Sequence, residues 1–313
     1  MLASLSTLVD SAFYNAPGYF LVALGILVSI RFAGFPDLTV DGSFTLGAAL
    51  YAFGIKCGLS VPMSLAFCTV GGIVAGELTA AVNSLLGIGR VISGVLTMIC
   101  ILTIVPYLVG GTTIGLLGRS YALSSVAQVD QRATQRLFPH AAFSLHLLFI
   151  GLSFAICGLI AFVLYLFFGT QLGLAIRYSG AAKFPGLLAP VMRRHLLFVG
   201  LGLGNSLVAL GGALEAERNG GFSQSMGIGA ILVGLATLTL GESVIKARRH
   251  RDNLSLAENV AAVALGILIY SFSLQLLLAL GVTFLDVRLT SALLLLGMLA
   301  WSGRHHSSAG KLF

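Results

Sequence analysis

Charged side chains are scarce in this chain of 313 residues. Asp, Glu, Lys and Arg together make up 9% of it, whereas 57% of the residues are hydrophobic. Soluble globular domains carry about 25% charged residues, so this composition excludes an ordinary soluble domain. The apolar stretches run to about twenty residues, which suits membrane-spanning helices and not the alternating ten-residue strands of an outer-membrane barrel. The sequence therefore predicts an all-α polytopic membrane protein.

Motifs for catalysis and cofactor binding are also missing. The chain holds no GxxxxGK[ST], GxSxG or HExxH sequence, which are signatures of nucleotide binding, serine hydrolases and zinc proteases. The six histidines show no metal-ligand spacing, and the four cysteines stand singly, without CxxC spacing. We therefore expect no cofactor, no metal and no enzymatic activity. We expect the cysteines to be small buried side chains; they are Cys57, Cys68, Cys100 and Cys157.

Lys and Arg are absent from the first fifteen residues, so the basic start of a cleavable signal peptide is missing. Apolar residues recur there at helical spacing, which is typical of a short interfacial helix leading into the first span. By contrast, residues 170–194 and 246–251 are rich in Lys and Arg. The positive-inside rule places both segments in the cytoplasm, and helix parity then places residues 110–141 and the N-terminus outside. The net charge of +7 thus indicates topology and not nucleic-acid binding.

We count nine apolar segments as predicted membrane crossings. Several are shorter than the roughly 20 residues that a full span needs, so we expect some broken or tilted helices. The predicted crossings are 17–33, 43–56, 63–86, 91–109, 142–169, 195–216, 226–245, 256–280 and 289–301. We treat residues 1–313 as a single transmembrane domain.

Residues 35–47, FPDLTVDGSFTLG, place carboxylates and hydroxyls between two of these crossings. A bilayer core tolerates such groups only where they line a cavity or are buried in protein. We predict that Asp37, Thr39, Asp41 and Ser43 line a substrate pathway at a helix break. The alternative is that Asp41 or Ser43 caps the following helix.

An internal repeat relates this region to the second half of the chain. LVALG at 21–25 recurs at 207–211, and three later pairs of glycines share an offset of 187 residues. Five crossings separate the two copies, so they run in opposite directions through the membrane. The sequence thus predicts an inverted repeat, the architecture in which broken helices meet near the midplane. Its halves are residues 17–169 and 195–303.

The repeat also extends the predicted pathway. The counterpart of residues 35–47 begins with Phe222 and is less polar, offering Ser223 and Gln224 where the first copy has two acids. We therefore predict that Ser223 and Gln224 line the opposite side of the pathway from Asp37 and Asp41.

Small residues form a stripe in the seventh predicted crossing. They fall at helical spacing, which lets another helix approach closely. One interpretation is a subunit or gating interface, and the other is ordinary packing within the bundle. The stripe consists of Gly227, Ala230, Gly234, Thr237 and Gly241.

The segment 170–194 is too apolar for a simple linker, and its glycines and prolines interrupt it too often for a span. We predict a short helix with turns on the cytoplasmic surface. It is either an amphipathic helix on the lipid surface or a docking element for a cytoplasmic partner.

Several stretches of the sequence resemble a known family, the bacterial ABC importer permeases of the branched-chain amino acid and ribose type. Within that family the chain is most similar to permeases associated with tryptophan or tyrosine uptake. The stretches are PDLTVDGSFTLGAAL at 36–50, GRVISGVLTM at 89–98, GLAIRYSG at 173–180, GLGNSLVALGGAL at 202–214 and GFSQSMGIGAILVGLATLTLGE at 221–242.

The resemblance implies a multi-pass permease in the bacterial inner membrane, present as a homodimer or paired with a second permease. It implies two further partners, a cytoplasmic ATPase and an extracytoplasmic solute-binding protein. The family's coupling loop corresponds to residues 172–194, although relatives commonly have GLAIRATGDN where this chain has GLAIRYSGAA. The implied ATPase contacts are Arg177, Tyr178, Ser179, Gly180, Lys183 and Pro185.

The expected function is therefore that of a permease subunit in an ATP-driven importer. The expected solute is a small organic molecule, for which the resemblance suggests an aromatic or other amino acid. A stand-alone transporter coupled to an ion gradient is the alternative, because it would share the inverted repeat and the intramembrane acids.

Overall fold

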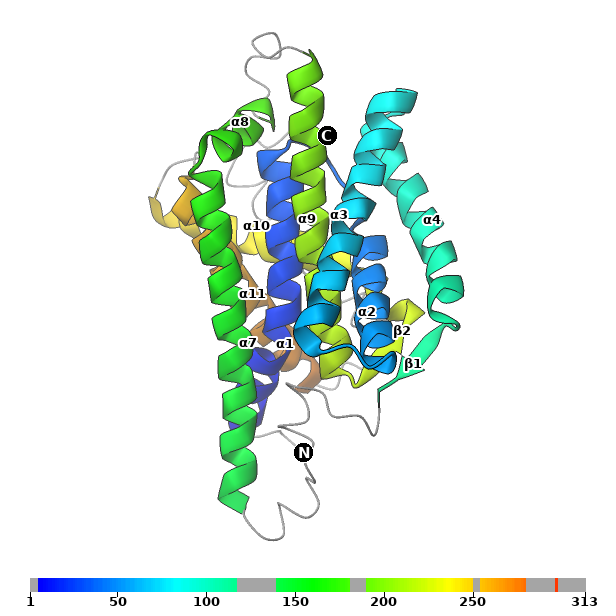
Figure 1. Ribbon diagram of the computed structural model, residues 1–313. Coiled ribbons are helices and arrows are strands. Elements are labelled where there is room, and N and C mark those ends of the chain that lie inside the picture. The colour runs from blue at the N-terminus through cyan, green and yellow to red at the C-terminus, as the bar shows by residue number, and fades with distance from the viewer. Residues whose placement is uncertain (1–4, 117–138, 181–189, 250–253, 280–295, 298–313) are drawn as a thin grey trace.

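The computed structural model describes residues 5–116, 139–180, 190–249, 254–279 and 296–297. Within these ranges the protein is almost entirely helical, as predicted (Figure 1). The longer helices are α1 (Leu5–Ile26), α3 (Val61–Leu86), α4 (Arg90–Val109), α7 (Pro139–Phe168), α9 (Pro190–Arg218), α10 (Ala230–Arg249) and α11 (Leu256–Ala279). The shorter elements are the π-helix η1 (Leu27–Phe32), α2 (Val40–Lys56), β1 (Thr113–Gly115), α8 (Gln171–Gly180), β2 (Gly221–Ser223) and the 3-10 helix η2 (Gln224–Gly227).

Seven helices of the described residues are long and apolar enough to cross a membrane. Helix α2 is the exception among the first eight predicted crossings, because its 17 residues span only about 25 Å, less than the roughly 30 Å of a bilayer core. The ninth predicted crossing lies almost wholly outside the described residues. The predicted interfacial helix at the N-terminus is not separate, because α1 continues from Leu5 through Pro17 to Ile26.

Helices α1 and α9 form the centre of the bundle and run in opposite directions (Figure 1). In the most apolar 18-residue stretch of each of these helices, 72% is buried, against 22% in the corresponding stretch of α7. Glycines allow the two backbones to approach: a Cβ built on Gly25 would lie 2.5 Å from the carbonyl oxygen of Gly204. At the other end of the crossing, a Cβ built on Gly211 would lie 2.6 Å from the carbonyl oxygen of Gly18.

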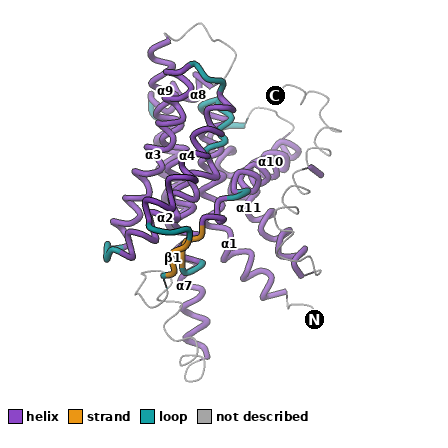
Figure 2. The backbone as a smooth tube through the Cα atoms, turned by 90° about the vertical axis from the view of Figure 1, so that its right-hand side faces the viewer, coloured by secondary structure: helices purple, strands orange, loops and turns teal. Residues whose placement is uncertain are grey.

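The remaining helices pack on two sides of this central pair. Helices α2, α3 and α4 pack together on the α9 side, whereas α7, α10 and α11 pack against α1 (Figure 2). Strands β1 and β2 pair with each other at the end of the bundle opposite α8, where they pack against α2 and β2 also contacts α9. They pair antiparallel with Ile114 opposite Phe222, and both side chains are buried. The ribbon therefore links segments from the two halves of the chain.

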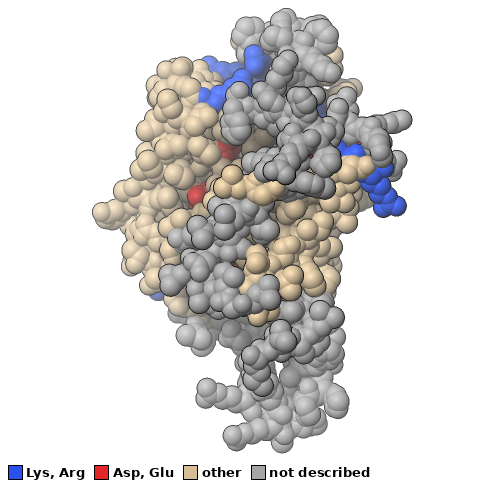
Figure 3. Space-filling view, turned by 180° about the vertical axis from the view of Figure 1, so that it is seen from behind, with Lys and Arg blue, Asp and Glu red and all other residues tan. Residues whose placement is uncertain are grey.

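Basic residues gather at the end of the bundle that carries α8 (Figure 3). Helix α8 and the last turn of α10, which are the described parts of the two segments predicted to be cytoplasmic, lie toward this end, and the turn between α2 and α3 lies at the other (Figure 1). The described basic residues near the α8 end include Arg31, Arg90, Arg177, Arg194, Lys246 and Arg248.

Two cysteines correct the expectation that all four are buried. Cys68 and Cys157 are buried, but Cys57 and Cys100 are exposed. Cys57 follows the last residue of α2 in a turn, and Cys100 lies on the outward face of α4 beside the exposed Ile99.

Candidate functional site

The polar stretch predicted to line a pathway begins where α1 loosens into a π-helix. Ala33 donates its N–H to the carbonyl of Val28 at 2.8 Å, and Phe35 donates to Ser29 at 2.9 Å. Gly34 then turns the chain with a φ of +64°, a left-handed conformation that glycine adopts without strain. Short π-helical segments inside longer helices are frequent at functional sites. The chain leaves this bend without regular secondary structure and enters α2 at Val40.

Asp37 is the buried acid of this site, with 1% of its surface exposed. Its Oδ1 accepts a hydrogen bond from the backbone N–H of Thr39 at 2.8 Å. Its Oδ2 accepts a second hydrogen bond from Nδ2 of Asn205 at 2.6 Å. Asp37 therefore satisfies a free amide at the start of α2 and joins that start to α9.

Asn205, on α9, is the central partner that sequence reasoning missed. Its Oδ1 accepts a hydrogen bond from Oγ of Ser43 at 2.6 Å, and its Nδ2 also donates to the carbonyl of Leu201 at 3.0 Å. Asn205 and Ser43 are both fully buried. The sequence could have indicated this role. A single asparagine in a membrane-spanning helix must find hydrogen-bond partners inside the bundle.

Thr39 completes the buried polar network. Its hydroxyl shares a hydrogen bond with that of Thr79, on α3, at 2.7 Å, and both side chains have no exposed surface. The structure thus brings three of the predicted pathway residues together, Asp37, Thr39 and Ser43. They tie the start of α2 to α3 and α9 and do not face open space.

Asp41 binds backbone amides that the sequence did not assign to it. Its Oδ2 accepts a hydrogen bond from the N–H of Gly229 at 3.0 Å, and its Oδ1 accepts one from Ile231 at 2.8 Å. These amides lie at the start of α10, so Asp41 caps a helix in the other half of the chain. The starts of the short helix α2 and of α10 therefore lie side by side.

Ser223 and Gln224 lie apart from the Asp37 network, at the end of the bundle that carries the β-ribbon. The hydroxyl of Ser223 shares a hydrogen bond with that of Ser225 at 3.2 Å. The side chain of Gln224 donates to the carbonyl of Leu102, on α4, at 3.0 Å, and its backbone N–H donates to Thr112 at 2.9 Å.

The residues of the small-residue stripe pack against several helices of the same chain. Gly227 approaches the backbone of Asp41, and Gly234 faces Ile26 and Val22 of α1. Gly241 instead lies against the backbone of Ala262, on α11. Ala230 is 2% exposed. The contacts that the structure describes are thus those of packing within the bundle.

The predicted coupling residues that the structure describes lie on α8, at one end of the molecule (Figure 1). The guanidinium of Arg177 lies 5.6 Å from the centre of the Phe32 ring, and the Tyr178 side chain is exposed. Ser179 donates its hydroxyl to the carbonyl of Ile176 at 2.8 Å, and Gly180 ends the helix. Lys183 and Pro185 lie outside the described residues.

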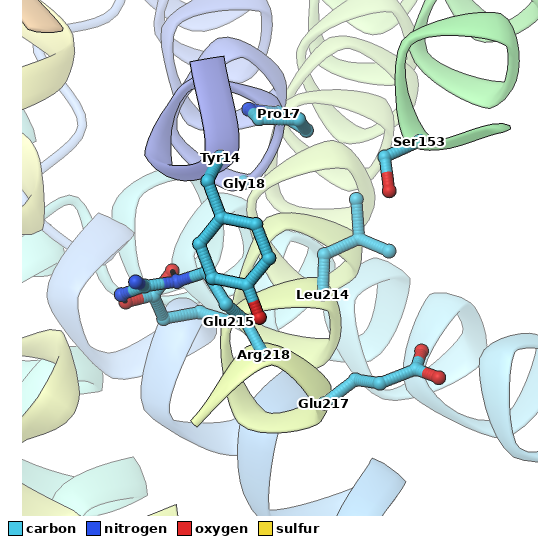
Figure 4. A pocket seen from close by; sticks show the side chains of 8 residues that line it. All are labelled: Tyr14, Pro17, Gly18, Ser153, Leu214, Glu215, Glu217 and Arg218. Atoms are coloured by element: carbon cyan, nitrogen blue, oxygen red, sulfur yellow. Dashed lines mark hydrogen bonds and ion pairs between the residues drawn. The ribbon is translucent and has the colours of Figure 1, made fainter. Parts of the chain in front are cut away.

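A small pocket lies at the opposite end, between α1, α7 and α9 (Figure 4). Arg218 binds the carboxylate of Glu215 and the side chain of Asn15, and its guanidinium lies 5.7 Å from the Tyr14 ring. Both acids here are buried, since Glu215 is only 5% exposed and Glu217 only 2%.

Metal chemistry has no donor set among the residues that the structure describes, where no three His, Cys, Asp or Glu side chains converge. The site is instead a network of hydrogen bonds among hydroxyl, amide and carboxylate groups. The two carboxylates lie where helices begin. Such an arrangement positions helices against one another.

Comparison with known proteins identifies what these helices build. Residues 8–302 match the family described as the permease component of branched-chain amino acid transport systems. The chain belongs to this family. It is the permease subunit of an ATP-driven importer and not an enzyme, because ATP hydrolysis takes place in a separate subunit. Permeases of this kind work with an ATPase and a substrate-binding partner.

Two curated relatives are similar to this permease over most of its length. The tyrosine transport system permease protein of Clostridioides difficile is 26% identical over 280 residues, which cover 90% of this chain and 86% of that protein. An uncharacterised protein of Rickettsia prowazekii is 30% identical over 274 residues, which cover 87% of this chain and 89% of the Rickettsia protein. No solved structure matches the permease.

Proposed function

We propose that this permease imports an aromatic amino acid, tyrosine or tryptophan, across a bacterial inner membrane. The observation that carries the proposal is the alignment with the tyrosine transport permease, which extends over 90% of the chain. A mostly apolar bundle with few internal charges also suits a zwitterionic or neutral solute better than a polyanion.

The proposed route for the solute follows the junction of α2 and α10. Both helices begin inside the bundle, and irregular backbone within a membrane is tolerated only where protein buries it or where it lines a cavity. In the described structure Asp37, Thr39 and Ser43 are closed off by Asn205 and Thr79. The route would therefore open when α2 separates from α9, while Ser223 and Gln224 would border its outer end.

The proposed contact with the ATPase is α8 and the segment that follows it. Helix α8 turns exposed apolar side chains away from the bundle, namely Leu172, Leu174 and Tyr178, although it lies at the basic end of the molecule. An exposed apolar patch with basic neighbours suits a protein partner. We extend the proposal to two copies of this permease, or a pair with a second permease, for each transporter.

The proposed internal symmetry is an inverted repeat of residues 17–169 and 195–303. The two LVALG copies support it, because they meet in a reciprocal contact. A Cβ on Gly25 would lie 2.7 Å from a methyl group of Val208, and a Cβ on Gly211 would lie 3.1 Å from a methyl group of Val22. Each contact joins the fifth residue of one copy to the second residue of the other.

Uptake into membrane vesicles tests the function. Right-side-out vesicles that contain the permease and its ATPase, loaded with ATP and supplied with its binding protein on the outside, should accumulate labelled tyrosine. Unlabelled tryptophan should compete, ribose should not, and a protonophore should leave the initial rate unchanged. Accumulation that requires a proton gradient and ignores ATP would overturn the proposal in favour of a stand-alone secondary transporter.

A further inference from the structure

The bend at the end of η1 is in direct backbone contact with α8. A Cβ built on Gly34 would lie 2.7 Å from the carbonyl oxygen of Gly180, the last residue of α8. A Cβ built on Gly180 would lie 2.7 Å from the nitrogen of Gly34 and would collide with the carbonyl oxygen of Phe32. No side chain separates the two segments, so rotamer changes cannot absorb a displacement of α8.

Phe32 strengthens this contact from within η1. Its ring centre lies 4.5 Å from that of Phe168, at the end of α7, and Arg177 of α8 lies over it. From the other side, Arg90 at the start of α4 donates a hydrogen bond to the carbonyl of Gly34 at 2.9 Å. The bend is therefore held between α8 and α4.

Arg31 connects the same segment to α10. Its Nε donates to Oε1 of Glu242 at 2.7 Å, and its Nη2 donates to Oε2 at 2.5 Å. The Glu242 side chain is only 5% exposed and that of Arg31 is 30% exposed, so the carboxylate of this two-point contact is shielded from water while the guanidinium is partly open to it. Lys246 also binds Glu242, at 2.9 Å, but it belongs to α10 itself and joins no second helix.

The opposite end of the bend leads into the buried network. Three residues after Gly34, Asp37 binds Thr39 and Asn205, and Asp41 caps the start of α10. Residues 31–41 therefore contact α8, both ends of α10 and the middle of α9 in one continuous run. A π-helix with a glycine bend is a structural element that can shift its register locally.

We propose that Arg31 and Gly34 are positioning residues for transport, which carry a displacement of α8 to α10 and to the α2–α9 junction. The inference rests on the proposed docking of the ATPase at α8. It assigns to η1 the task of connecting ATP hydrolysis to the helices that border the solute route. Loss of the Arg31 contact would leave the ATPase active while less solute moves per ATP.

The test measures tyrosine transported per ATP hydrolysed by the complete transporter in vesicles. R31Q should lower this ratio severalfold, and R31K, which keeps the charge but not the two-point geometry, should fall between R31Q and wild type. K246Q is the matched control, because it removes a cation from the same carboxylate without separating two helices. G180A should lower the ratio too, whereas G158A should not, since a Cβ there meets no atom within 4 Å.

A purely structural role would lower transport and ATP hydrolysis in proportion, so an unchanged ratio in R31Q overturns the inference. An equal fall of the ratio in K246Q also overturns it. If G180A fails to fold, the ratios measured for R31Q and R31K still test the inference. If the wild-type protein shows no ATP-dependent uptake, the proposed function is refuted, and this inference falls with it. If the wild type transports and only the variants behave otherwise than expected, the inference alone is refuted.

Discussion

The carboxylate of Asp41 caps a helix that begins far along the chain, because its Oδ1 accepts the N–H of Ile231, 190 residues further on, at 2.8 Å. Gly229 donates a second hydrogen bond to the same side chain. The first turn of α10 is thus completed by a residue of α2, and each of these two helices depends on the other for its position.

Replacing Asp41 should destabilise the permease. D41A removes both acceptors at the start of α10, and loss of a helix cap costs about 1–2 kcal/mol. D41N keeps one oxygen and should cost less. Thermal unfolding of the detergent-solubilised protein measures the effect, with D10A as an acidic control in the first turns of α1. A melting temperature of D41A equal to that of wild type would contradict the role of the cap.

Removing Asn205 should have a larger effect. N205A leaves Asp37 and Ser43 without the hydrogen bonds that Asn205 makes, and each buried unsatisfied polar group costs about 1–3 kcal/mol. S43A removes only one hydrogen bond and should be milder. Asn259, whose side chain bonds to backbone carbonyls near the exposed start of α11, supplies the control N259A. The ranking is wrong if N259A lowers the unfolding temperature as much as N205A.

The crossing of α1 and α9 should tolerate no added methyl group. G25A would place a Cβ 2.5 Å from the carbonyl oxygen of Gly204, and G211A would place one 2.6 Å from that of Gly18. Overpacking of this kind costs about 1–3 kcal/mol. Both variants should express at lower levels and unfold earlier than G158A. Wild-type stability in G25A would show that the helices lie further apart than described.

Thiol labelling tests the orientation in the membrane. Cys57 is exposed in the turn after α2, at the end opposite the basic α8, so it should face the outside. A membrane-impermeant maleimide added to intact cells should label the wild type and not C57S. R248C in a C57S background should react only after the cells are opened. Labelling of R248C from outside would invert the assignment.

The regular helices could be predicted from the sequence because long apolar stretches carry the necessary information locally. The short surface helix α8 could also be predicted from its glycines and basic residues, and the interruption before α2 could be predicted from Asp37 and Asp41. The π-helical form of η1 could not be predicted, since its residues are as apolar as those of α1. The predicted count of nine crossings remains a prediction.

The partners within the site could not be predicted, because they are set by tertiary packing. Asp37 and Asn205 are 168 residues apart, and no local pattern relates them. The roles of the two acids illustrate the limit. The sequence offered Asp41 or Ser43 as a cap for the following helix, whereas in the structure Asp37 binds the start of α2 and Asp41 binds the start of α10.

The distance along the chain between these partners also governs how the protein can be made. A ribosome completes Asp37 and the whole of α2, which contains Asp41 and Ser43, long before it reaches Asn205 or Ile231. Asn205 lies 162 residues beyond Ser43, and Ile231 lies 190 residues beyond Asp41. The newly inserted first helices must therefore keep these polar groups hydrated or shielded by the insertion machinery until α9 and α10 emerge. The buried polar contacts of the permease can therefore form only after the second half of the chain has been inserted.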